Sequence, residues 1–105
     1  MRVTHTTALV LVALARGVRH GFDILEATEL KSGTVYPSLR RLEDAGLVRS
    51  RWEAVQRARD AGRPPRRLYE LTGAGALALE EAVERHPRVL DAFAPVRGPL
   101  RPRPA

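Results

Sequence analysis

The hydrophobic pattern of this chain changes its period at Gly46, and this change limits the fold more than any other feature. Before it, Val35, Leu39 and Leu42 recur at the i, i+4, i+7 spacing of one buried helix face. After it, apolar or small residues alternate with charged ones over 48–54, the pattern of a half-buried strand. The sequence therefore predicts a helix that stops at a glycine and leads directly into a strand.

The start of that helix is indicated by Pro37. Proline has no N–H and fits without distortion only in the first turn of a helix. Residues 31–34 are of types common at caps and turns, and we expect the last of them, Thr34, to be the N-cap of a helix that runs to Ala45. An earlier start would imply a kink.

Two helices are expected before it. The first covers about Thr4–Arg16, with Gly17 just beyond its end. Apolar residues occupy most of its circumference. This pattern is typical of a central core helix or of one shared with a partner subunit. The second is about two turns long, over about Phe22–Thr28.

A hairpin and a last helix follow. The second strand of the hairpin is predicted at Arg67–Leu71, and the polar stretch 55–66 between the two strands is expected to form a long exposed tip. Trp52 and Tyr69 on the two strands favour a cross-strand core pair over a base-stacking platform. Thr72 is expected to cap a helix over about Gly73–His86.

Length, charge and composition limit the class of protein. A chain of 105 residues has room for one small domain, and a net charge of +6 suits a polyanionic partner such as nucleic acid. The chain has no cysteine, which excludes disulfides and thiolate sites. The longest apolar run, 8–15, is too short to cross a bilayer and does not resemble a signal peptide. We therefore expect a cytoplasmic protein without membrane association.

Several runs of residues resemble the signature of the PadR-like transcriptional regulators. They are Gly-Phe-Asp-Ile at 21–24, Ser-Gly-Thr-Val-Tyr-Pro-Ser-Leu-Arg-Arg-Leu-Glu at 32–43, Gly-Leu-Val at 46–48, Gly-Arg-Pro-Pro-Arg at 62–66 and Tyr-x-Leu-Thr at 69–72. The resemblance implies a mainly α winged helix-turn-helix fold with three helices, a two-stranded β-hairpin wing and a C-terminal dimerisation helix. It also implies a dimeric DNA-binding regulator, most often a repressor, that reads an inverted repeat.

The chain departs from that family in two places. The segment between Ile24 and Ser32 is shorter than in many relatives, which implies a truncated second helix. The comparison with larger members also leads us to expect no long C-terminal helical dimerisation domain, which would leave the helix over Gly73–His86 and residues 89–93 to pair subunits. We expect a winged helix domain over 1–72, a dimerisation segment over 73–94 and a disordered, proline-rich tail over 95–105.

The predicted contacts with double-stranded DNA lie on the third helix and in the wing. They are Lys31, Ser32, Thr34, Tyr36, Pro37, Ser38, Arg40, Arg41, Arg63, Arg66 and Arg67. Hydroxyl groups at a helix N-terminus suit phosphate oxygens, and Arg40 is the candidate for reading guanine. Seven arginines between positions 49 and 67, against two acidic residues, favour a DNA-binding wing. Packing of Tyr36 on the wing, a solvated Arg41 and a merely soluble loop remain the alternatives.

Five residues are expected to pair two copies of the chain. They are Leu9 and Val12 on the first helix and Ala76, Leu79 and Val83 on the last. The alternative is that this last stripe covers its own subunit.

No catalytic site is predicted. The three histidines are scattered, and no phosphate-binding loop is present, so we expect neither enzyme activity nor a cofactor. The resemblance allows a small apolar effector of unknown identity between subunits. A winged helix that acts only as a protein-interaction module remains the alternative function.

Overall fold

A nearly all-apolar helix, α1 (His5–Ala15), runs through the middle of the molecule. The computed structural model describes residues 3–93. Thr4 caps this helix, and its hydroxyl accepts a hydrogen bond from the Thr7 backbone N–H at 3.2 Å. Every residue of α1 from Thr7 to Ala15 is buried. A helix that is apolar on all sides is stable only when other elements cover all of them.

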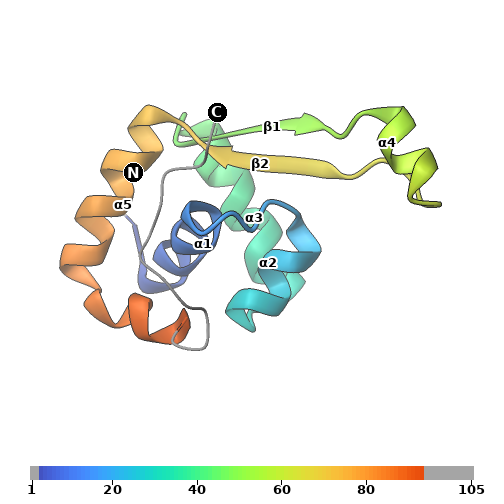
Figure 1. Cartoon of the computed structure of the whole chain (residues 1–105). Coiled ribbons are helices and arrows are strands. Elements are labelled where there is room, and N and C mark those ends of the chain that lie inside the picture. The colour runs from blue at the N-terminus through green and yellow to red at the C-terminus, as the bar shows by residue number, and fades with distance from the viewer. Residues whose placement is uncertain (1–2, 94–105) are drawn as a thin grey trace.

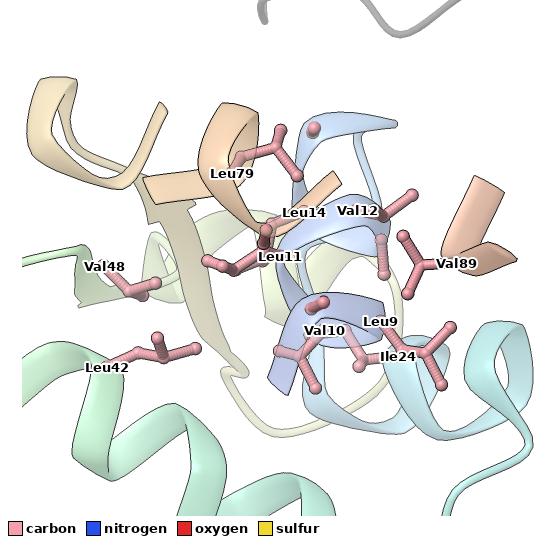
Figure 2. Close-up of a cluster of buried hydrophobic side chains, with 14 of the residues drawn as sticks. Leu9, Val10, Leu11, Val12, Leu14, Ile24, Leu42, Val48, Leu79 and Val89 are labelled. Atoms are coloured by element: carbon pink, nitrogen blue, oxygen red, sulfur yellow. The ribbon is translucent and has the colours of Figure 1, made fainter. Parts of the chain in front are cut away.

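Three helices and one 3-10 helix surround α1 (Figure 1). They are α2 (Gly21–Thr28), α3 (Ser32–Asp44), α5 (Gly73–Arg85) and η1 (Pro87–Phe93). Figure 2 shows how the side chains of Ile24, Leu79 and Val89 converge on α1 from three of these elements. Val89 is fully buried in this core, so the expectation that residues 89–93 could pair subunits is wrong for Val89.

The expected dimer contacts on α1 are wrong for the same reason. Val12 has no exposed surface and Leu9 only 6%, because α2, α5 and η1 of the same chain cover them. The sequence left open whether this apolar helix was central or shared, and the structure makes it central.

The third helix begins earlier than predicted. Its N-cap is Lys31, and the backbone N–H groups of Thr34 and Val35 donate to the Lys31 carbonyl at 2.9 and 3.0 Å. The N-cap at Thr34 is therefore wrong, and Pro37 lies inside the helix. The proline leaves the Gly33 carbonyl without its helical N–H partner, but Gly33 is exposed and water can replace that partner.

The wing is an antiparallel pair of strands, β1 (Val48–Trp52) and β2 (Arg67–Leu71). The register pairs Val48 with Leu71 at the base and Trp52 with Arg67 at the outer end. The other edge of β2 is held by Arg19, whose carbonyl accepts from the Tyr69 N–H at 3.0 Å. The long tip expected over 55–66 contains the short helix α4 (Val55–Asp60), which the sequence analysis did not predict.

The last helix buries a face shifted from the predicted stripe. Gly75, Leu79 and Ala82 are buried, whereas Ala76 is exposed and Val83 is half-buried. Leu79 therefore packs in its own chain, and its assignment to the dimer contact is wrong. The tail predicted to be disordered, 95–105, lies outside the described residues. Within the described part of the chain, no helix is both long and apolar enough to span a membrane.

Candidate nucleic-acid interface

Helix α3 has one buried face and one face open to solvent. Val35, Ser38, Leu39 and Leu42 form the buried face. The exposed residues at its N-terminal end and along the opposite face include five predicted contacts: Lys31, Ser32, Tyr36, Pro37 and Arg40. This arrangement follows from the helical period and leaves an accessible surface with two cations and two hydroxyl groups.

Ser38 does not belong to that surface, and its predicted contact with DNA is wrong. The side chain is fully buried, and its hydroxyl donates to the Thr34 carbonyl at 2.8 Å. The hydroxyl also accepts a hydrogen bond from Nη2 of Arg41 at 3.3 Å. Ser38 lies three residues after Val35 and so shares its inward face, where the hydrogen bonds satisfy a buried polar group.

Tyr36 lies against the start of α2. A Cβ placed on Gly21 would lie 2.5 Å from Cε1 and 2.6 Å from the hydroxyl oxygen of Tyr36, so a side chain there would displace the ring. The tyrosine remains 44% exposed. Gly21 thus allows the two helices to approach closely enough for the Tyr36 hydroxyl to lie at their shared surface.

Arg40 and Arg41 are both exposed but differ in their contacts. The Arg41 guanidinium is tied to Ser38, which indicates that it partly stabilises its own helix. No hydrogen bond or ion pair of Arg40 is recorded among the described residues. The Arg40 guanidinium is therefore available for contact with a partner.

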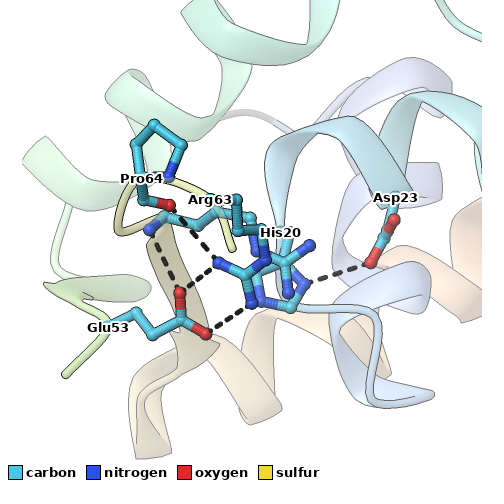
Figure 3. Close-up of polar contacts among 6 residues, drawn as sticks. His20, Asp23, Glu53, Arg63 and Pro64 are labelled. Atoms are coloured by element: carbon cyan, nitrogen blue, oxygen red, sulfur yellow. Dashed lines mark hydrogen bonds and ion pairs between the residues drawn. The ribbon is translucent and has the colours of Figure 1, made fainter. Parts of the chain in front are cut away.

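The wing arginines do not act alike. Both terminal nitrogens of Arg63 donate to the carboxylate of Glu53, one of them at 2.9 Å (Figure 3). These hydrogen bonds lower the pKa of Glu53 from 4.5 to about 2. The sequence analysis assigned Arg63 to DNA and did not anticipate this pair, in which the Arg63 guanidinium is already bound to a carboxylate of the wing.

Arg67 lies over the indole ring of Trp52, with its Cζ 5.3 Å from the ring centroid. Its Nε also donates to Oγ of Ser50 at 3.1 Å. Trp52 is 62% exposed, so the predicted core pair with Tyr69 is wrong. The register pairs Tyr69 with Ser50, whereas Trp52 pairs with Arg67 at the outer end of the hairpin.

The sequence analysis counted the arginines of the tip helix among the seven of the wing but did not single them out as contacts. Arg57 and Arg59 lie on α4, are exposed, and flank Ala58, which is fully buried. The available sequence feature was the arginine count of the wing, but that count does not separate exposed side chains from paired ones.

The remaining titratable clusters are small. Nδ1 of His20 lies 3.0 Å from Oδ2 of Asp23, and the rings of His5 and His86 meet edge to face with their centroids 5.8 Å apart. Over the residues that the structure describes, no three histidine or carboxylate side chains are placed to hold a metal ion.

Comparisons with known proteins agree with this geometry. The family model described as the transcriptional regulator PadR-like family matches residues 10–81. No curated protein matches the chain.

Solved structures share its fold. A PadR family transcription regulator from Clostridium difficile R20291 has a TM-score of 0.60 at 25% identity, over 84% of this chain and 97% of the other. A PadR-like transcription factor from Bacteroides fragilis has a TM-score of 0.57 at 25% identity, over 86% of this chain and 88% of the other. Wild-type ZitR of Lactococcus lactis, solved in complex with DNA, has a TM-score of 0.63 at 20% identity, over 91% of this chain. This chain spans only 61% of the length of ZitR.

Proposed function

This chain belongs to the PadR-like family of transcriptional regulators, and from that premise we propose that it binds double-stranded DNA with sequence preference. The observation that carries the proposal is the open face of α3. Val35, Leu39 and Leu42 anchor the helix in the core, where α3 packs against β1 of the wing, and its exposed face carries Lys31 and Arg40. The major groove is about 12 Å wide and accepts one α-helix, so this face is the part of the molecule suited to enter it.

The residues on this face suit different roles. Lys31, Ser32 and Tyr36 are suited to phosphate oxygens and would position the helix. Arg40 is suited to a bidentate contact with guanine, which reads sequence. Thr34 is half-buried but keeps a hydroxyl that suits a phosphate oxygen, whereas Pro37 has no donor and would make van der Waals contacts. The solved complex of ZitR with DNA supports the proposal because that protein has the same fold.

We further propose that two copies act together as a repressor on an inverted repeat. Half-site symmetry in DNA mirrors a two-fold protein dimer, and a bound dimer would exclude other proteins from a promoter. We assign this pairing to the exposed face of α5, because Ala76 and Leu77 are exposed there, Leu77 to 64%. Val83 lies partly in the core and would contribute only at the edge of such a contact.

The experiment compares Arg40→Ala with Arg88→Ala. Both remove one exposed arginine, but Arg88 lies on η1, away from α3 and the wing. Footprinting upstream of the gene that encodes this chain identifies the protected sequence, and affinity for that duplex is then measured. Arg40→Ala should weaken specific binding by about 1–3 kcal/mol and relax preference at one base pair. Arg88→Ala should change it little.

Two results would refute the proposal. One is an Arg40→Ala protein that binds the protected duplex as tightly as the Arg88→Ala protein does. The other is a wild-type chain that protects no DNA and binds no duplex, which would favour a winged helix that acts through a protein partner.

A further inference from the structure

The wing tip is a folded unit with a defined internal structure. The Glu53 N–H donates to the Arg66 carbonyl at 2.8 Å and closes the base of the tip. The Arg63 N–H donates to the Ala58 carbonyl at 3.1 Å, which brings the chain back across α4. Gly62, with φ of +71°, makes the reversal between them, a conformation that favours glycine.

An ion pair between a buried carboxylate and a half-buried arginine lies at the centre of this unit. Glu53 is only 5% exposed, and its carboxylate accepts from both terminal nitrogens of Arg63 and from the Arg66 N–H at 3.4 Å. A buried carboxylate is unfavourable unless a cation and hydrogen-bond donors compensate it. The pair therefore favours the one tip conformation in which Arg63 reaches Glu53.

The outer surface of the tip helix carries two exposed cations, one on each side of the buried Ala58. Arg57 and Arg59 are exposed, while the one acidic side chain of α4, Asp60, accepts a hydrogen bond from Nε2 of Gln56 at 2.8 Å. In Figure 1, α4 lies at the end of the hairpin farthest from α5, beyond the side of the molecule where α2 and α3 lie. Cations at this distance can reach duplex that lies outside the groove next to α3.

We propose that the Glu53–Arg63 pair positions the tip helix α4 of the wing, so that Arg57 and Arg59 on that helix contact the DNA backbone. Glu53 and Arg63 are positioning residues that hold α4 in place. This inference rests on the proposed DNA binding and extends it, because it names the pair that places the wing tip and the two arginines that the tip helix exposes. Backbone contacts of this kind are electrostatic and do not depend on base sequence.

The first test removes the two exposed charges. The Arg57→Ala/Arg59→Ala protein is compared with Arg85→Ala/Arg88→Ala, which removes two exposed arginines from α5 and η1. Sedimentation first establishes that both variants assemble as the wild type does. Binding to a mixed-sequence DNA duplex of about 30 base pairs is then measured against salt concentration. The tip variant should lower the slope of log affinity against log salt by up to about 2, since each phosphate contact contributes about 0.9. The control slope should match the wild type.

The second test separates positioning from charge. Glu53→Gln and Glu53→Ala both raise the net charge by one, so charge alone predicts tighter binding to DNA. If the tip must be held in place, affinity should instead fall in the order wild type, Glu53→Gln, Glu53→Ala, because glutamine keeps an acceptor for Arg63. Amide hydrogen exchange over 55–63 should accelerate in the same order, with exchange in α1 unchanged.

The outcomes distinguish this inference from the proposed function. If the wild type binds the duplex and the tip variant behaves as its control does, the contact of Arg57 and Arg59 with the DNA backbone is refuted and DNA binding through α3 stands. Tighter binding by Glu53→Ala would overturn the positioning role. If the wild type binds no duplex, both proposals fail together.

Discussion

Gly75 on α5 lies directly against the backbone carbonyl of Leu47, in the turn that precedes β1. A Cβ on Gly75 would overlap that oxygen and lie 3.2 Å from Cδ2 of Leu71. The Leu47 oxygen also accepts a hydrogen bond from the Thr72 N–H at 3.1 Å, so it cannot move away freely. This contact joins the last helix to the base of the wing.

We expect Gly75→Ala to destabilise the fold. The new methyl group meets backbone and not a flexible side chain, and overpacking of this kind typically costs about 1–3 kcal/mol. Gly73→Ala is the matched control, because nothing lies within 4 Å of its Cβ position. Chemical denaturation should show a lower free energy of unfolding for Gly75→Ala alone. Equal stability of the two variants would contradict the close contact.

Gly21→Ala should act through Tyr36. The methyl group would meet the outer end of an exposed side chain, which can rotate away, so the loss of stability should stay below about 1 kcal/mol. DNA affinity should fall by an amount similar to that of Tyr36→Ala. The double variant should bind no more weakly than Tyr36→Ala alone, and additive losses would show that the two positions act independently.

Acid should loosen the wing tip before it unfolds the core. Hydrogen bonds from Arg63 lower the pKa of Glu53 to about 2 in the folded protein, below the value of 4.5 in the unfolded chain. A carboxyl group whose pKa is lower in the folded than in the unfolded state stabilises the fold fully at pH values above its unfolded-state pKa. That stabilisation is lost as the pH falls from about 4.5 through about 2.

The single tryptophan, Trp52, adjoins Glu53 and reports this change by its fluorescence. We expect a fluorescence transition over that pH range in the wild type and its absence in Glu53→Gln, with helix content followed by circular dichroism. An identical transition in both proteins would assign it to other carboxyl groups.

Dimerisation, if it uses α5, should depend on Leu77. Leu77→Glu places a charge on the exposed face of the helix, whereas Phe22→Glu changes an equally exposed apolar side chain, 64% in both cases, on α2. Sedimentation at micromolar concentration should show monomers for Leu77→Glu and dimers for the wild type and for Phe22→Glu. A dimer that survives Leu77→Glu would exclude this face.

Local sequence patterns predicted most of the elements correctly. Thr72 caps α5 as expected, α1 begins within one residue of its predicted start with Thr4 as its cap, and both strands begin at the predicted residues, Val48 and Arg67. These features depend on neighbours along the chain: a cap needs a hydroxyl two or three residues before the N–H that it accepts from, and a strand needs alternation. The family resemblance, which the match over residues 10–81 confirms, depends on the same local runs.

The partners of individual side chains were decided by the tertiary structure. An apolar α1 is compatible with a core or with an interface, and only the packing of α5 and η1 shows that Val12 is internal. An arginine in a wing is compatible with DNA or with a carboxylate, and only the return of the chain past α4 places Arg63 on Glu53. Periodicity assigns a residue to a face, but what covers that face depends on contacts between residues distant in sequence, and these no local pattern encodes.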